Sequence, residues 1–163
     1  MSDRRLMVRM AEKAVSSALD DVLVSLGLGS CIGLALIDES AGVAGLVHIV
    51  LPRSPVAGAG STPAKFADSA VPLLLEEVLG AGGRQGHLRA VVCGGAHMFG
   101  GGSANSLLQI GARNAEATLV SLEELRIPVR GTDTGGSVGR SVEVQVASGS
   151  VSVRSVGQSA RRL

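Results

Sequence analysis

Aromatic side chains are scarce in the sequence, which has no Trp, no Tyr and two Phe residues, Phe66 and Phe99. Proteins that bind single-stranded nucleic acid stack bases on aromatic rings, so this scarcity argues against that class. The core must be built from Leu, Val, Ile and Ala, within an apolar content of 45%. A chain of 163 residues predicts one domain, residues 1–163, that buries about 70% of its unfolded surface.

An excess of charge of one sign is also missing, because 15 basic residues face 14 acidic ones and the net charge is +1. Nucleic-acid-binding domains carry a basic surface that neutralises phosphates, so we predict no nucleic-acid partner. The glycine-rich residues 94–102 lack the Gly-Lys-Ser/Thr of a phosphate-binding loop. The sequence therefore predicts no cofactor.

Long hydrophobic runs are absent as well. Residues 1–5 are not followed by the apolar run of a signal peptide, and no window approaches about 18 apolar residues. Two cysteines, Cys31 and Cys93, cannot staple a fold of this size, which is typical of a reducing compartment. We expect a cytoplasmic protein with no direct membrane insertion.

Strand patterns outnumber helix patterns along the chain. A weak strand pattern covers residues 6–16, and clearer ones cover 22–26, 31–37, 43–51, 88–93, 127–132, 141–147 and 150–155. One helix is expected to start at Thr62, with Pro63 in its first turn, and to end at Gly80. Another is expected over residues 106–126. These elements predict an α+β fold in which two main helices cover mostly antiparallel strands.

The apolar spacing of the second helix predicts its buried face. The residues expected on that face are Leu107, Ile110, Ala117, Val120 and Leu125.

A hairpin pairing argument brings Cys31 and His48 together. If residues 38–42 form a five-residue loop, Cys31 falls opposite Ile49, and a one-residue change in loop length places it opposite His48. Facing residues have Cβ atoms about 4.5–5.5 Å apart. The two side chains are therefore expected to be near neighbours on one ribbon.

A cysteine beside a histidine is a nucleophile with its base. An imidazolium neighbour lowers the pKa of the thiol, and neighbouring glycines leave backbone N–H groups free to hold an oxyanion. We expect these N–H groups near Ser30 and Cys31. Ser25 is a candidate for orienting the imidazole of His48. The alternative is that Cys31 is a small core residue, since free cysteine is often buried.

A metal site is a further alternative. Cys31, His48, Cys93 and His97 supply the donor types of a zinc site, but their spacing is not that of a zinc finger. We predict no metal and read Cys93 as a buried structural thiol. His97 is expected in a loop, and Asp133 is expected to form an ion pair with Arg140.

Six segments in order resemble the chemoreceptor glutamine deamidases, the CheD family of bacterial chemotaxis, over nearly the whole chain. They are LGLGSCIG at 26–33, GLVHIVLP at 45–52, KFAD at 65–68, GGAHMF at 94–99, IGARN at 110–114 and IPVRGTDTGGSVGR at 127–140.

The resemblance implies a compact α/β sandwich that converts glutamine side chains of chemoreceptors to glutamate, with release of ammonia. The family's nucleophilic cysteine matches Cys31 and its histidine matches His48. Its third residue is usually a threonine, whose position here is Ser25. The implied partners are chemoreceptor cytoplasmic domains, as substrate, and for some members a CheC-type phosphatase.

Two other functions stay open from the sequence. The same thiolate chemistry suits a receptor glutamyl methylesterase. A non-catalytic chemotaxis adaptor, binding receptors or a CheC-type phosphatase, would need none of Ser25, Cys31 and His48.

Overall fold

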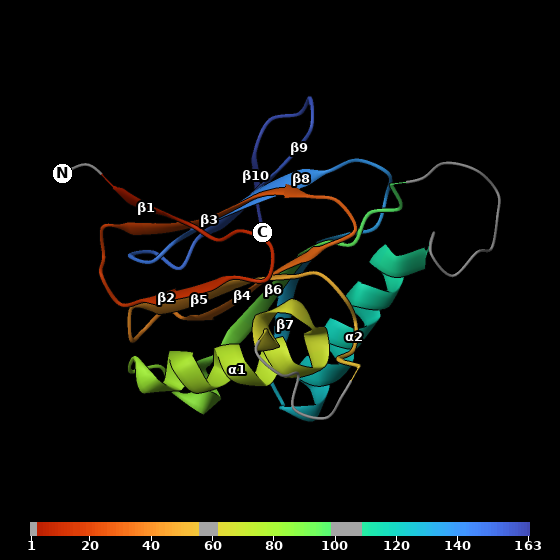
Figure 1. Ribbon diagram of the computed structural model, residues 1–163. Helices are drawn as coiled ribbons and strands as arrows, with labels where there is room; N and C mark the ends of the chain where they lie inside the picture. Colours follow the sequence, from red (N-terminus) through yellow and green to blue (C-terminus); the bar gives the residue numbers. More distant parts are fainter. Residues whose placement is uncertain (1–2, 56–61, 99–108) are drawn as a thin grey trace.

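The computed structural model describes residues 3–55, 62–98 and 109–163. Two five-stranded sheets lie face to face, and two helices cover the outer face of one of them (Figure 1). One apolar cluster fills the space between the sheets, and another fills the space between the second sheet and the helices. Of the eight strand pairs described, six are antiparallel. The predicted α+β fold with helix-covered, mostly antiparallel strands is confirmed.

The first sheet has the strand order β1-β3-β8-β9-β10. The β1/β3 pair is parallel and the other pairs are antiparallel. Its strands are β1 (Arg4–Met7), β3 (Asp21–Leu28), β8 (Arg140–Gln145), β9 (Val151–Ser155) and β10 (Arg161–Arg162).

The second sheet has the order β2-β5-β4-β6-β7, with a parallel pair only at β6/β7 among its described strands. Every residue of its adjacent strands β4 and β5 is buried, because one face meets the first sheet and the other meets the helices. The strands are β2 (Lys13–Ser16), β4 (Ile32–Asp38), β5 (Val43–Ile49), β6 (Arg89–Gly94) and β7 (Val129–Thr134).

Helix α1 (Ala67–Gly80) begins later than predicted. Pro63–Lys65 forms a short 3-10 helix (η1), and Phe66 is extended because it bridges to Leu51 before the helix starts. The helix then packs closely on β5, where Gly45 makes room: a Cβ there would lie 2.9 Å from Leu74 Cδ1. A second short 3-10 helix, η2 (Gln85–His87), precedes β6.

Helix α2 (Ile110–Glu124) lies within the predicted range, of which residues 106–108 fall outside the described part. Its predicted buried face is wrong in part, because Val120 is 46% exposed. The buried side chains are largely polar, namely Asn114, Thr118 and Ser121, together with Leu122.

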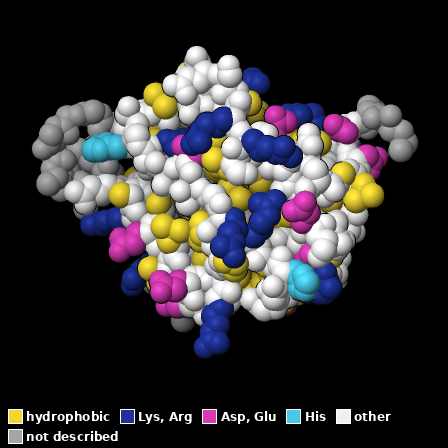
Figure 2. Space-filling view, turned by 180° about the vertical axis from the view of Figure 1, so that it is seen from behind, with side chains coloured by type: hydrophobic (Ala, Val, Ile, Leu, Met, Phe, Trp, Pro, Cys, Tyr) yellow, Lys and Arg dark blue, Asp and Glu magenta, His cyan; other side chains and the backbone are white. Residues whose placement is uncertain are grey.

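The outer surface carries both signs of charge. On the face seen in Figure 2, basic and acidic side chains occur together among apolar ones. Ion pairs among the described residues include Arg5–Glu143 and Lys13–Glu77, both at 2.6 Å. No helix in the described residues is long and apolar enough to cross a membrane.

Candidate active site

The β4–β5 hairpin sets the relation between Cys31 and His48. His48 is paired with Gly33, and Asp38 is paired with Val43, so the turn has four residues and the predicted five-residue loop is wrong. Asp38 stays in the strand because its buried carboxylate accepts the N–H of Ala41 at 3.0 Å and thereby holds the turn from inside.

This register makes Cys31 a diagonal neighbour of His48 rather than a facing one. Cys31 lies two residues before Gly33, on the same face of the sheet, and belongs to the cluster between the sheets. Diagonal positions are about 7–8 Å apart at the backbone. The two side chains thus share one end of the inter-sheet space.

The structure joins His48 to Ser25 across the two sheets. Ser25 Oγ lies 2.9 Å from His48 Nδ1 and 2.8 Å from the carbonyl oxygen of Val8, and both side chains are buried. A carbonyl only accepts, so the hydroxyl proton goes to Val8 and Ser25 Oγ accepts the Nδ1–H of His48. The proton on Nδ1 leaves Nε2 with a free lone pair, which is the form a general base needs.

The chain segment between β1 and β2 is hydrogen-bonded to both Ser25 and His48. The predicted single strand over residues 6–16 is in fact two strands in different sheets, separated by a crossing in which Ala11 has φ 62°. In this crossing the Ala11 N–H donates to the His48 carbonyl, and the His48 N–H donates to the Glu12 carbonyl, each at 3.0 Å. Val8 supplies the acceptor for Ser25, so the crossing touches both residues.

Gly94 and Gly95, at the end of β6, contact the main chain of Cys31. The Gly95 N–H donates to the Cys31 carbonyl at 2.8 Å, and Ala96 donates to Gly29 at 2.8 Å. Gly94 has φ 106°, and a Cβ there would collide with the Cys31 carbonyl oxygen. Only glycine fits this approach.

Burial disfavours the charged forms of both Cys31 and His48. Burial raises the pKa of the Cys31 thiol. Burial also lowers the pKa of His48, against smaller raising effects of the Val8 backbone and Glu12. His48 Nε2 has no hydrogen-bond partner among the described residues. Both shifts favour the thiol and the neutral imidazole over the thiolate–imidazolium pair that the sequence predicts.

Asn114 is a residue of this region that our sequence reasoning missed. Its Nδ2 donates to the carbonyl oxygens of Ser30 and Val50, each at 2.9 Å. The available signal was an amide side chain within the IGARN segment, on a helix face that the apolar spacing did not select.

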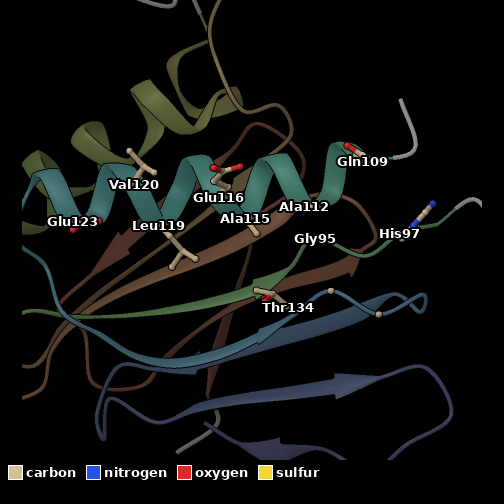
Figure 3. A pocket seen from close by; sticks show the side chains of 12 residues that line it. Gly95, His97, Gln109, Ala112, Ala115, Glu116, Leu119, Val120, Glu123 and Thr134 are labelled. Carbon is tan, nitrogen blue, oxygen red and sulfur yellow. The ribbon is translucent and has the colours of Figure 1, made fainter. Parts of the chain in front are cut away.

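The two remaining residues of the zinc alternative are separated: Cys93 is paired with Gly33 and belongs to the same inter-sheet cluster as Cys31, whereas His97 lies in a groove beside α2. Cys93 is fully buried, and burial raises the pKa of its thiol to about 12. His97 lines a groove between α2 and the ends of β6 and β7, with Leu119 and Thr134 (Figure 3). Ser25, Cys31 and His48 do not line this groove. Within residues 3–55, 62–98 and 109–163, no three His, Cys, Asp or Glu side chains are grouped to hold a metal ion.

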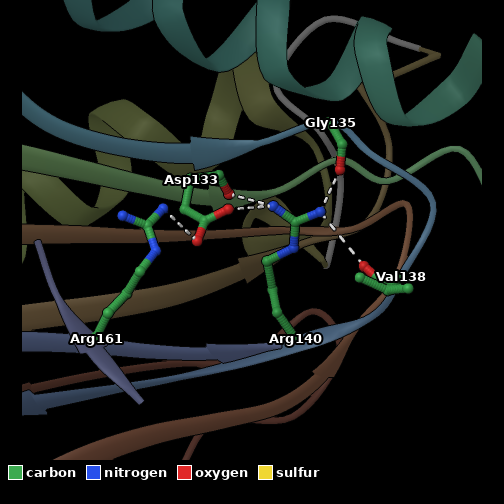
Figure 4. Close-up of polar contacts among 5 residues, drawn as sticks. All are labelled: Asp133, Gly135, Val138, Arg140 and Arg161. Atoms are coloured by element: carbon green, nitrogen blue, oxygen red, sulfur yellow. Dashed lines mark hydrogen bonds and ion pairs between the residues drawn. The ribbon is translucent and has the colours of Figure 1, made fainter. Parts of the chain in front are cut away.

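The predicted ion pair of Asp133 and Arg140 is confirmed, with 2.6 Å between Oδ1 and the guanidinium. Arg140 is buried and also donates to the carbonyls of Gly135 and Val138, while Arg161 pairs with Asp133 at 2.8 Å (Figure 4). The network fixes the turn at Gly135, whose N–H donates to Gly94. It thereby supports the segment that holds Cys31.

Comparisons with known proteins agree along the chain. A family model described as CheD chemotactic sensory transduction matches residues 50–155. A protein of Desulfitobacterium hafniense (strain DSM 10664 / DCB-2), named "Probable chemoreceptor glutamine deamidase CheD", is 41% identical over 151 residues, 93% of each chain. A protein of Clostridium botulinum (strain Hall) with the same name is 41% identical over 137 residues, 84% of this chain and 85% of its own.

The two comparisons cover different parts of the site. The family model begins after His48, whereas an alignment over 93% of the chain must span the segment from Ser25 to His48.

Proposed function

The chain belongs to the CheD family of chemotactic sensory transduction proteins, and on that premise we propose that it is a chemoreceptor glutamine deamidase with Cys31 as nucleophile and His48 as base. Ser25 orients the base. The substrate is a glutamine side chain in a chemoreceptor cytoplasmic domain, which places the enzyme in the cytoplasm. The names of the relatives support the reaction.

The observation that carries the proposal is the hydrogen bond between Ser25 and His48. It links two buried polar side chains from different sheets and fixes the imidazole tautomer with the lone pair on Nε2. An adaptor would not need a buried histidine whose second nitrogen is left without a protein partner among the described residues. A base beside a thiol does need it.

The reaction begins from the neutral pair. Nε2 of His48 takes the Cys31 thiol proton as sulfur attacks the amide carbon, and the carbonyl electrons move onto oxygen. Backbone N–H groups at Ser30 and Cys31 hold this oxyanion. The C–N bond breaks while His48 returns its proton to nitrogen, so ammonia leaves and a thioester remains.

Water completes the cycle. His48 deprotonates a water molecule, which attacks the thioester carbon, and the C–S bond breaks with the proton passing to sulfur. The product is glutamate with one added negative charge. No step uses a metal ion.

The test is incubation of the purified protein with a receptor cytoplasmic domain, read by mass spectrometry of the receptor peptides. We expect amide-to-acid conversion at selected glutamines, and no conversion by Cys31→Ala. Binding of the receptor without conversion would favour the adaptor, and conversion by Cys31→Ala would refute the cysteine mechanism. A methyl-esterified receptor, run in parallel, measures any methylesterase activity.

A further inference from the structure

We propose that Asn114 is a positioning residue that orients the Cys31 N–H for the oxyanion, an inference that rests on the deamidase function proposed above. Asn114 lies in the first half of α2 with its side chain fully buried. Its amide nitrogen donates to Ser30 and Val50 at 2.9 Å each, so both of its N–H bonds are used.

The contact with Ser30 acts on Cys31 through one peptide unit. The Ser30 carbonyl and the Cys31 N–H belong to the same planar trans peptide and point in opposite directions. Because Asn114 on α2 holds the carbonyl, the Cys31 N–H is directed away from the helix. This N–H makes no hydrogen bond to any residue that the structure describes.

The contact with Val50 fixes the same peptide against the strand that carries the base. The paired stretch of β4 and β5 ends at Ile32 and Ile49. Ser30 and Val50 lie just beyond that end, and the Asn114 amide connects their carbonyls. The peptide before the nucleophile is thus held in a defined position relative to the strand of His48.

The other end of the Asn114 side chain argues against a role in stability alone. Its Oδ1 is buried and has no hydrogen-bond partner in the described part of the chain. A buried acceptor without a partner costs free energy, so what this side chain contributes comes through its two donated hydrogen bonds. The helix that carries it is held close to the sheet, where Gly95 and Gly111 leave no room for a Cβ.

The expected effect is on the transition state. An oxyanion exists only after attack, so a misdirected Cys31 N–H lowers kcat and leaves KM nearly unchanged. Alkylation of Cys31 by iodoacetamide forms no oxyanion and should be unaffected. These two readouts separate an oxyanion role from a general loss of site structure.

The experiment compares Asn114→Ala with Thr118→Val. The Thr118 hydroxyl donates to the main-chain carbonyl of Asn114, so Thr118→Val loses a buried hydrogen bond one turn further along α2 and keeps the Asn114 side chain. For Asn114→Ala we expect kcat on a receptor domain to fall about tenfold to a hundredfold, with KM and the Cys31 alkylation rate within about twofold of the unsubstituted protein. Thr118→Val should keep kcat within about twofold. An unchanged kcat in Asn114→Ala, or equal losses in both variants, would overturn the inference.

A second variant covers the case in which Asn114→Ala does not fold. Asn114→Asp has the same shape, and its carboxyl supplies a donor only when protonated. The ratio of its kcat to that of the unsubstituted protein should rise as pH falls, and a flat ratio contradicts the proposal. Absence of conversion by the unsubstituted protein would instead overturn the proposed function, and this inference with it.

Discussion

The two faces of the central strands β4 and β5 are built for different purposes. Toward the helices, β4 presents the large side chains Ile32, Leu34 and Leu36. Toward the other sheet, it presents Gly33 and Ala35, with Ile37 at its far end, and the cluster there includes Cys31. At the end of β4 where Cys31 lies, one face packs large apolar side chains against the helices, and the other face carries the proposed chemistry.

The small residues on the inter-sheet face explain how the site forms. Gly33 lies opposite His48, and a Cβ on it would lie 2.9 Å from Leu28 Cδ1 in the other sheet. Without that atom the sheets approach closely enough for Ser25 to reach His48. Close packing and catalytic geometry therefore depend on the same glycine.

The largest expected contrast is between Cys31→Ala and Leu34→Ala, two truncations three residues apart that face opposite sides of the sheet. Cys31→Ala should abolish deamidation, by about a thousandfold or more, and leave the fold intact. Leu34→Ala removes a fully buried side chain and should cost about 2–5 kcal/mol of unfolding free energy. Denaturant unfolding and receptor deamidation measured on both variants test the division. An active Cys31→Ala protein would break it.

A smaller effect is expected at Ser25. Ser25→Ala should lower kcat about tenfold to a hundredfold with little change in KM, because the hydroxyl orients the imidazole without adding charge. Ser25→Thr should retain activity, since the added methyl restricts χ1 and keeps the hydroxyl. If Ser25→Ala shifts only the unfolding midpoint and leaves kcat unchanged, the residue is structural and the site is a Cys31–His48 dyad.

The third prediction concerns the charge state of the Cys31 thiol on the inter-sheet face. Because burial raises the pKa of Cys31, its alkylation by iodoacetamide should rise about tenfold per pH unit from neutral pH toward pH 9. Cys93, fully buried with a pKa of about 12, should react more slowly throughout. Mass spectrometry of labelled peptides gives both rates. A rate for Cys31 that is flat from about pH 5 would indicate a thiolate–imidazolium pair instead.

The smallest effect on activity is expected from added methyl groups on the two faces. Gly33→Ala forces the sheets apart and should cost about 1–3 kcal/mol, with a severalfold loss of kcat because Ser25 and His48 separate. Gly45→Ala is the matched control, since its Cβ would meet Leu74 and Val78 on the helix side. It should destabilise similarly without changing kcat. Equal losses of kcat would show that the faces are not independent.

The sequence predicted the fold and the neighbourhood of Cys31 and His48, but it missed the register between them. Asp38 is a common turn residue and was assigned to the loop, whereas its carboxylate is buried and bonds the turn from the end of β4. A hairpin register depends on where the strand ends. Because an aspartate usually indicates a turn, a buried aspartate within a strand makes the predicted strand end too early. His48 is therefore paired with Gly33, one residue along from the pairing that a five-residue loop predicts.

Asn114 escaped prediction for a related reason. Apolar periodicity identifies buried faces that are apolar, but the buried face of α2 is largely polar and bonded within the protein. Thr118 and Asn114 resemble surface residues in a sequence, because their partners are main-chain oxygens that no pattern reveals. Single-residue roles of this kind require coordinates.

The crossing between β1 and β2 allows the site to lose activity by local opening, without unfolding of the whole domain. These two strands lie at the edges of their sheets, each with one neighbouring strand in the described sheets, so they can open without separating the rest of the sandwich. Opening removes the Val8 acceptor from Ser25 and both main-chain bonds of His48. Hydrogen exchange of residues 4–16 would therefore report the fraction of molecules able to react, and activity should be lost at a denaturant concentration below that of global unfolding.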